Sequence, residues 1–132
     1  MIALIANRPF DLVVEIGLVM VTPAYQRTPV ASDATFALLN HVFSLKYRRV
    51  EWKTNVHNKR SRKAAERMGF VQEGIFRSHM IVQGGANRDT AWYSMITEDW
   101  NSTKVCDQDA WLDSPAAREL FEKRKRELVN GV

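Results

Sequence analysis

The sequence predicts a mixed α/β (α+β) fold, and three observations lead to this prediction. First, its segments follow the order strand, strand, helix, strand, helix, strand, strand, helix. Second, two of these helices lie between strands, which is the arrangement of strand–helix–strand crossovers. Third, the chain has 132 residues, 45% of them hydrophobic and 26% charged, which is ordinary for a soluble domain with a single core.

The first part of the sequence predicts two strands and a helix. Residues 1–6, MIALIA, form a short apolar run, and NRPFD after it indicates a turn. Residues 12–21, LVVEIGLVMV, are typical of a strand buried on both faces. We expect Thr28 to cap the next helix, with Pro29 at its first position, where the missing N–H costs nothing. The apolar stripe of this helix would comprise Val30, Ala34, Leu38, Val42 and Leu45.

The second part predicts a strand, a short helix, a hairpin and a last helix. Residues 48–55, RRVEWKTN, alternate as a strand does, and residues 58–68 predict a helix closed by Gly69. The segments FVQEGIFRSHMIVQ and TAWYSMITEDW, joined by GGANRD, predict a long β-hairpin. Residues 114–129 predict an amphipathic helix that begins at Ser-Pro. We therefore expect one domain over residues 1–104 and a C-terminal extension over residues 105–132.

Charge and residue usage narrow the classes of function. The net charge of +4 and the pI near 9.5 favour acidic partners such as phosphates, anionic cofactors or nucleic acid. The one cysteine, Cys106, excludes an intrachain disulfide, and no metal-ligand spacing is present, so no metal is expected. Arg8 and Glu15 are among the residues that interrupt the apolar N-terminal stretch, which predicts neither a signal peptide nor a membrane span. We expect a cytoplasmic protein without a membrane partner.

The basic helix HNKRSRKAAERMGF, residues 57–70, allows three interpretations. It is a packed helix with a solvated basic face, a nucleic-acid-binding patch, or a helix start that faces an anion with Asn58 as a polar group. Nucleic-acid binding would call for aromatic side chains interleaved with the basic ones, or for a recognised module, and neither is present here, so we expect no nucleic-acid partner. Arg62 can pair with Glu66, four residues further on.

The segment upstream supports the anion interpretation. A buried strand ends, a short loop follows at Gln26-Arg27-Thr28, and a helix begins. This order directs the first free backbone N–H groups of the helix at one point, where the helix dipole favours a negative group. Arg27 adds a full positive charge. The junction is therefore a natural cradle for a pyrophosphate.

The joint pattern of strand VEIGLVMV, loop QRTPVA, strand RRVEWKTN and helix NKRSRKAAERMGF resembles the GNAT N-acetyltransferase superfamily, and within it the RimJ/RimL-like branch. The likeness runs from about Val14 to Trp100. Its most specific parts are Asn58-x-x-Ser61, Gly69-Phe70, Glu73-Gly74 and Asn87-Arg88-Asp89. The resemblance implies a mixed central sheet flanked by helices, acetyl-CoA as acetyl donor, and transfer to a primary amine of a protein N-terminus, a lysine or a small molecule.

The resemblance also implies roles for individual residues. Glu15 would be the general base, although a structural ion pair with a basic residue is an equal alternative. Ser61 would protonate the leaving thiolate, or else hydrogen-bond its own backbone. Asn58 would bind the pantetheine arm, or else only cap its helix. The remaining cofactor contacts would come from Met20, Val21, Gln26, Arg27, Thr28, Val30, Ala31 and Ser32.

Three departures from the family pattern matter. Pro29 replaces the first glycine of the phosphate loop, which stiffens the loop but leaves the following N–H groups free. Ala65 stands where many members have the general-acid tyrosine, so Ser61 or a water molecule would replace it. The family's first strand and helices have no counterpart, so we expect a partial GNAT domain that self-associates through its exposed sheet or is marginally stable. The alternative function is a catalytically impaired CoA-binding or interaction domain.

Overall fold

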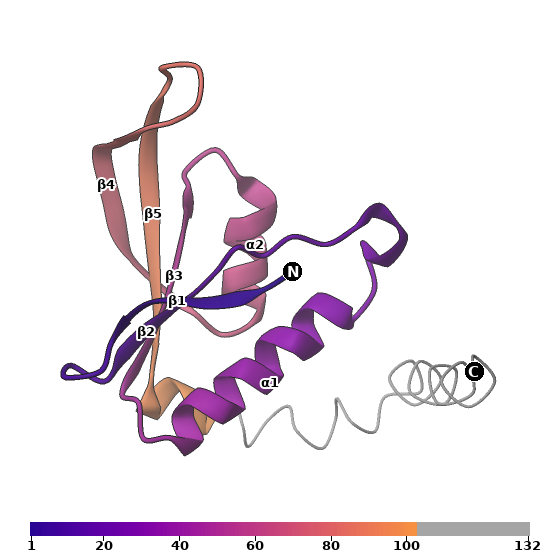
Figure 1. Ribbon diagram of the computed structural model, residues 1–132, viewed down its shortest axis with the longest axis vertical. Helices are drawn as coiled ribbons and strands as arrows, with labels where there is room; N and C mark the ends of the chain where they lie inside the picture. Colours follow the sequence, from indigo (N-terminus) through magenta and orange to yellow (C-terminus); the bar gives the residue numbers. More distant parts are fainter. Residues whose placement is uncertain (103–132) are drawn as a thin grey trace. The chain divides into compact units, whose positions relative to one another are not determined.

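A five-stranded mixed sheet with the strand order β1-β2-β3-β5-β4 forms the centre of the fold in the computed structural model, which describes residues 1–102 (Figure 1). Strands β2 and β3 are parallel, and the other neighbouring strands are antiparallel. The elements are β1 (Ala3–Arg8), β2 (Val13–Gly17), the 3₁₀ turn η1 (Pro23–Tyr25), α1 (Val30–Ser44), β3 (Arg49–Asn55), α2 (Lys59–Arg67), β4 (Val71–Ile81) and β5 (Asn87–Ile96).

This architecture confirms the predicted mixed α/β fold, with two strands before α1 and a hairpin after α2. Helix α1 connects the parallel pair β2 and β3, as a parallel pair requires. The predicted helix over residues 114–129 lies outside the described residues, as does the whole predicted C-terminal extension over residues 105–132.

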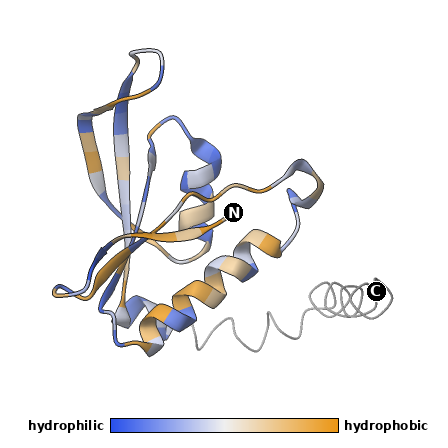
Figure 2. Cartoon of the chain, viewed as in Figure 1, coloured by the Kyte–Doolittle hydropathy of each residue, from blue (hydrophilic) through white to orange (hydrophobic). Residues whose placement is uncertain are grey.

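The core lies between one face of the sheet and helices α1 and α2. Because side chains alternate along a strand, this face receives every second residue of β2, β3 and β5. Helix α1 contributes Leu39, which is fully buried, and α2 contributes Ala65. Figure 2 shows β1 as largely hydrophobic and the first turn of α2 as hydrophilic. The main core residues are Val14, Ile16, Leu39, Val42, Phe43, Val50, Trp52, Ala65, Phe70, Ala91, Tyr93, Met95 and Trp100.

Three local predictions around α1 were wrong. Strand β2 ends at Gly17 rather than at residue 21, because Leu18 takes a φ of 53° that leaves the extended conformation. Thr28 does not cap α1: its hydroxyl donates to the Tyr25 carbonyl at 2.7 Å. Leu45 is 56% exposed, because α1 ends at Ser44. The buried residues of α1 are Thr35, Leu39, Val42 and Phe43, a stripe rotated from the predicted one.

The predicted helix over residues 58–68 is confirmed as α2. The Asn58 side chain accepts a hydrogen bond from the Ser61 N–H at 3.1 Å and so caps the helix, and Gly69 follows the helix with a φ of 90°. The predicted pair of Arg62 and Glu66 is bridged by the buried Tyr93: Arg62 Nε donates to the Tyr93 hydroxyl, which donates to Glu66.

Candidate functional site

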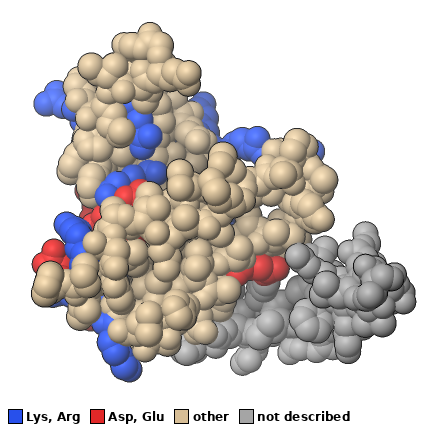
Figure 3. Space-filling model, in the orientation of Figure 1, with Lys and Arg blue, Asp and Glu red and all other residues tan. Residues whose placement is uncertain are grey.

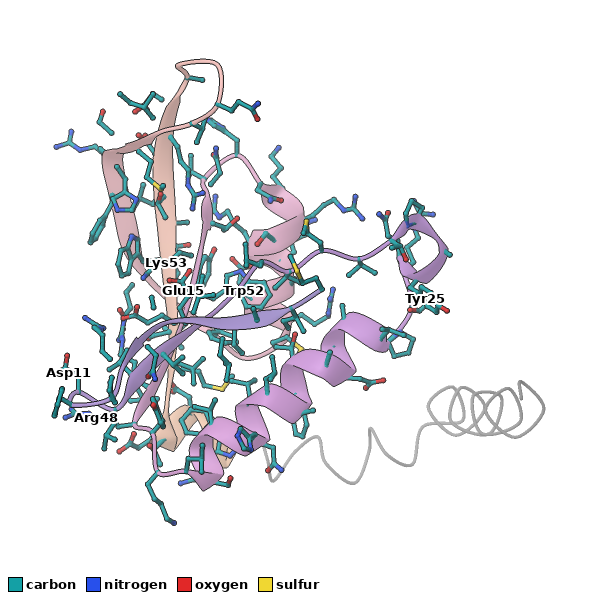
Figure 4. The ribbon with its side chains drawn as sticks, viewed as in Figure 1. Asp11, Glu15, Tyr25, Arg48, Trp52 and Lys53 are labelled. Carbon is teal, nitrogen blue, oxygen red and sulfur yellow. The ribbon has the colours of Figure 1, made fainter. Side chains whose placement is uncertain are left out.

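The loop between β2 and α1 is held by its own hydrogen bonds. The Gln26 side chain donates to the Val21 carbonyl at 3.3 Å, and Thr28 bonds Tyr25. Arg27, at the turn of the loop, has a φ of 61°. Figure 4 shows Tyr25 in this loop, before the start of α1.

The start of α1 offers free hydrogen-bond donors. Asp33 N–H makes a backbone hydrogen bond of the first turn, to the Pro29 carbonyl at 2.9 Å. The N–H groups of Val30, Ala31 and Ser32 precede this bond, so the helix itself does not need them. Together with the helix dipole and the exposed Arg27 they make a positive site for an anion.

The basic helix α2 contacts the loop between β2 and α1 through a side-chain hydrogen bond. Arg60 Nη2 donates to the Gln26 side-chain oxygen at 3.3 Å, which joins two segments that are far apart in the sequence. Figure 3 shows Lys and Arg side chains on the surface near this loop. The tertiary structure therefore brings a second arginine to the loop that contains Arg27, and sequence reasoning had not identified Arg60 in this role.

Asp33 also belongs to the first turn of α1, and sequence reasoning missed it. Its Oδ1 atom is buried and has no hydrogen-bond partner among the described residues. Burial raises the pKa of this carboxyl group. A carboxylate in a helix's first turn interacts favourably with the dipole, so Asp33 competes with any external anion for the same positive potential.

After β2, the backbone groups of Met20, which the resemblance assigns to the cofactor, already make hydrogen bonds within the chain. The N–H of Met20 donates to the Met1 carbonyl at 2.7 Å, and the N-terminal ammonium donates to the Met20 carbonyl. An open cavity of about 180 Å³ lies beside this pairing. It brings Met20 and Val21 together with Val30 and Ala31, and its lining is completed by Met1, Ile2, Val19, Thr22, Tyr25 and Ala34.

The two predicted site residues at the start of α2 differ in their burial. Ser61 lies at the edge of the core, and its Oγ accepts a hydrogen bond from Trp52 Nε1 at 3.0 Å. Asn58 is exposed, and its side-chain oxygen is used by the helix cap. Ala65, at the position of the family's tyrosine, is fully buried and supplies no proton.

Glu15 lies on the sheet face opposite the core, because it alternates with Val14 and Ile16. Its carboxylate accepts a hydrogen bond from Lys53 Nζ at 2.8 Å, and Figure 4 shows the two residues side by side. Lys53 also contacts Glu51 at 3.0 Å and lies 4.1 Å from the centre of the Trp92 ring. The structure therefore contains the ion pair that was one of the two alternatives for Glu15.

The ion pairs continue across the sheet. Arg8 and Arg49 both contact Glu51, at 3.1 and 3.0 Å. Burial raises the pKa of Glu51, but hydrogen bonds from Lys53 and Arg49 outweigh it, so the pKa lies below its ordinary value. Arg49 also donates twice to Glu73, both at 2.7 Å, and the Ser94 hydroxyl donates to the same carboxylate. These bonds lower the pKa of Glu73 to about 2.

We expect Glu73 to make the stability of the fold depend on acid pH. Its pKa is about 2 in the folded chain against an ordinary value of 4.5, so its contribution is complete above pH 4.5 and is lost as the pH falls toward 2. Glu73→Gln should flatten this decline in a series of melting temperatures. An equally steep decline in the variant would contradict the assignment.

The arrangement of β2, α1 and β3 indicates the class of protein to which this chain belongs. A parallel strand pair joined through α1, with free N–H groups at the helix start, is typical of α/β domains that bind the phosphates of a nucleotide or cofactor. A family model described as acetyltransferase (GNAT) domain matches residues 1–71. The chain belongs to this GNAT acetyltransferase family, as its resemblance indicated.

Solved structures support the assignment. A GCN5-related N-acetyltransferase from Brucella melitensis is 45% identical with a TM-score of 0.80, over 86% of this chain and 51% of its own. A probable GNAT acetyltransferase from Chromobacterium violaceum is 39% identical with a TM-score of 0.73, over 76% and 50%. The spermidine/spermine N-acetyltransferase SpeG from Vibrio cholerae, 19% identical with a TM-score of 0.67 over 76% and 59%, shares the fold. This chain spans about half the length of the first two relatives.

The curated proteins contain no match to this chain. Within residues 1–102, no helix combines the length and apolar character needed to cross a membrane. Among these same residues, no group of three or more His, Cys, Asp or Glu side chains is arranged to hold a metal ion.

Proposed function

We propose that this chain binds acetyl-CoA and transfers the acetyl group to a primary amine, as a RimJ/RimL-like N-acetyltransferase. The observation that supports this most directly is the start of α1, where the helix leaves its first N–H groups unused. The loop before it contains Arg27, and Arg60 contacts this loop through the Gln26 side chain. Two arginines and a helix N-terminus suit the two charges of a pyrophosphate.

In this proposal the cofactor lies along the loop and the start of α2. The N–H groups of Val30, Ala31 and Ser32 bind the pyrophosphate, with Gln26, Arg27 and Thr28 around it. Asn58 binds the pantetheine arm through the –NH₂ end of its side chain, since the oxygen caps the helix. The backbone near Met20 and Val21 receives the thioester end. For this, the bond between Met20 N–H and Met1 has to open.

The chemistry needs few groups from the chain. Acetyl-CoA supplies an activated acyl carbon with a thiolate leaving group. Glu15 accepts the proton of the acceptor ammonium, directly or through water, so that the neutral amine can attack. A C–N bond forms as the C–S bond breaks, the attacking nitrogen releases its second proton to water, and the Ser61 hydroxyl or a water donates a proton to the leaving sulfur. Positioning of the two substrates supplies much of the remaining rate.

Release of free thiol from acetyl-CoA tests this proposal. The purified chain is incubated with acetyl-CoA and, separately, with a peptide bearing a free N-terminus, a lysine peptide and a polyamine. Thiol release that depends on one of these amines supports an acetyltransferase and identifies the acceptor class. No release with any amine, and no binding of CoA by calorimetry, would overturn it.

The second candidate function is a CoA-binding domain without turnover. Two observations favour it: Ala65 supplies no general acid, and Lys53 already holds the proposed base Glu15. Saturable binding of CoA without amine-dependent thiol release would support this function over the first.

We further propose that the catalytic domain ends near residue 104 and that the chain is cytoplasmic, with no membrane or nucleic-acid partner and no metal. Self-association through the exposed sheet face is part of this proposal. Sedimentation of the purified chain tests the last point, and CoA binding in the presence of duplex DNA tests the exclusion of nucleic acid. A concentration-independent monomer would contradict self-association.

We expect Asn58→Ser to weaken acetyl-CoA binding by about three- to tenfold without lowering the melting temperature. Serine caps a helix about as well as asparagine but lacks the –NH₂ donor for a ligand, and one neutral hydrogen bond contributes about 1 kcal/mol. Asn58→Ala, which loses both functions, is the matched comparison and should lower the melting temperature as well. Full affinity in Asn58→Ser would reduce Asn58 to a helix cap.

A further inference from the structure

Ser61 of α2 makes a different hydrogen bond from Thr35 and Ser44 of α1. Thr35 and Ser44 in α1 donate their hydroxyl hydrogens to backbone carbonyls of their own helix, at 2.7 and 2.6 Å. The Ser61 hydroxyl is instead hydrogen-bonded to Trp52 Nε1 at 3.0 Å. An indole nitrogen is only a donor, so in this bond Ser61 Oγ is the acceptor. The hydrogen of Ser61 therefore points away from Trp52.

Trp52 is held rigidly. Trp52 is 4% exposed and belongs to the central strand β3. The centre of its ring lies 5.6 Å from the centre of the Phe70 ring. On the other side of the bond, Ser61 is held by its N–H bond to Asn58 in the first turn of α2. Trp52 is thus fixed by packing and Ser61 by the helix cap, so the direction of the indole N–H is fixed too.

We infer that Trp52 is a positioning residue for acetyl transfer, which directs the Ser61 O–H toward the leaving sulfur. This inference rests on the proposed role of Ser61. When the C–S bond breaks, the Ser61 proton passes to the thiolate, and Ser61 regains a proton from solvent while Glu15 holds the proton from the amine. The indole N–H stabilises negative charge that develops on Ser61 Oγ, because hydrogen bonds in series polarise one another.

Trp52→Phe tests the inference, since it removes the indole N–H and keeps an aromatic ring against Phe70. We expect kcat to fall about five- to tenfold, the effect of one lost hydrogen bond, with KM for acetyl-CoA within about twofold. Trp100→Phe is the matched control: Trp100 is 3% exposed and stacks on Phe43 at 5.4 Å in the same core. It should retain the kcat of the unaltered chain.

A double-mutant cycle with Ser61→Ala separates positioning from structure. If Trp52 acts through Ser61, the double variant is no slower than Ser61→Ala alone. An equal slowing by Trp52→Phe in both backgrounds would overturn the inference. If Ser61→Ala keeps full kcat, the proposed role of Ser61 fails and this inference fails with it, while thiol release by the unaltered chain still supports the acetyltransferase.

Trp52→Phe can leave a cavity in the core and so lower the fraction of folded protein. In that case benzothienylalanine at position 52, which replaces the N–H by sulfur in a ring of the same shape, gives the same test. A loss of kcat with an unchanged melting temperature supports the inference, and an unchanged kcat overturns it.

Discussion

Glu15→Gln is expected to lower kcat for acetyl transfer by about 10²- to 10⁴-fold, the usual contribution of a general base, while acetyl-CoA affinity stays within about twofold. The base acts on the amine and not on the cofactor, so only the step that needs a neutral amine is affected. The rate of the variant should recover at high pH, where free amine is abundant. Steady-state kinetics over a pH series and calorimetry measure both quantities.

The ion pair with Lys53 makes a control necessary, since Glu15→Gln also changes the packing of charges on the sheet. Glu51 is the register partner of Glu15 and contacts the same Lys53 at 3.0 Å. Glu51→Gln should lower the melting temperature and retain most of kcat, because its carboxylate binds Arg8, Lys53 and Arg49 rather than substrate. If Glu15→Gln is as fast as the unaltered chain at neutral pH, Glu15 is only the structural partner of Lys53.

Arg27→Glu is expected to weaken acetyl-CoA binding by roughly 1–3 kcal/mol, or about 5- to 150-fold in the dissociation constant. The substitution removes a cation from the phosphate cradle and places an anion there. The loss should shrink at high salt, because exposed charges are screened. Calorimetric titration at two ionic strengths measures the effect.

Arg48→Glu is the matched control for Arg27→Glu. It makes the same change in net charge, and Figure 4 shows Arg48 at the far end of the fold from Tyr25 and the loop. Arg48 is exposed, and its backbone N–H bonds the Leu12 carbonyl. Acetyl-CoA affinity should stay near that of the unaltered chain in this control. Equal affinity in Arg27→Glu and Arg48→Glu would place the cofactor elsewhere.

Elements with local signals were predictable from the sequence. Helix α2 was found within a residue at each end, because a capping Asn58 and a closing Gly69 act on residues only a few positions away. The hairpin of β4 and β5 followed from its Gly-Gly turn, whereas the anion cradle proposed from the order of strand, loop and helix stays a prediction. The family resemblance also depended on these short patterns, and the comparisons confirmed the family.

Features that depend on distant residues were decided only by the tertiary structure. Strand β2 stops at Gly17 before a segment in which Met20 pairs with Met1, a contact over nineteen positions. The alternatives for Glu15 stayed open in the sequence because its partner Lys53 is brought near by the parallel register of β2 and β3. Likewise, only the packing of β3 against α2 places Trp52 on Ser61. A capping Asn58 and a closing Gly69 are local and mark the ends of α2, whereas the end of β2 and the partners of a buried polar group depend on strand register and helix packing, which no short pattern encodes.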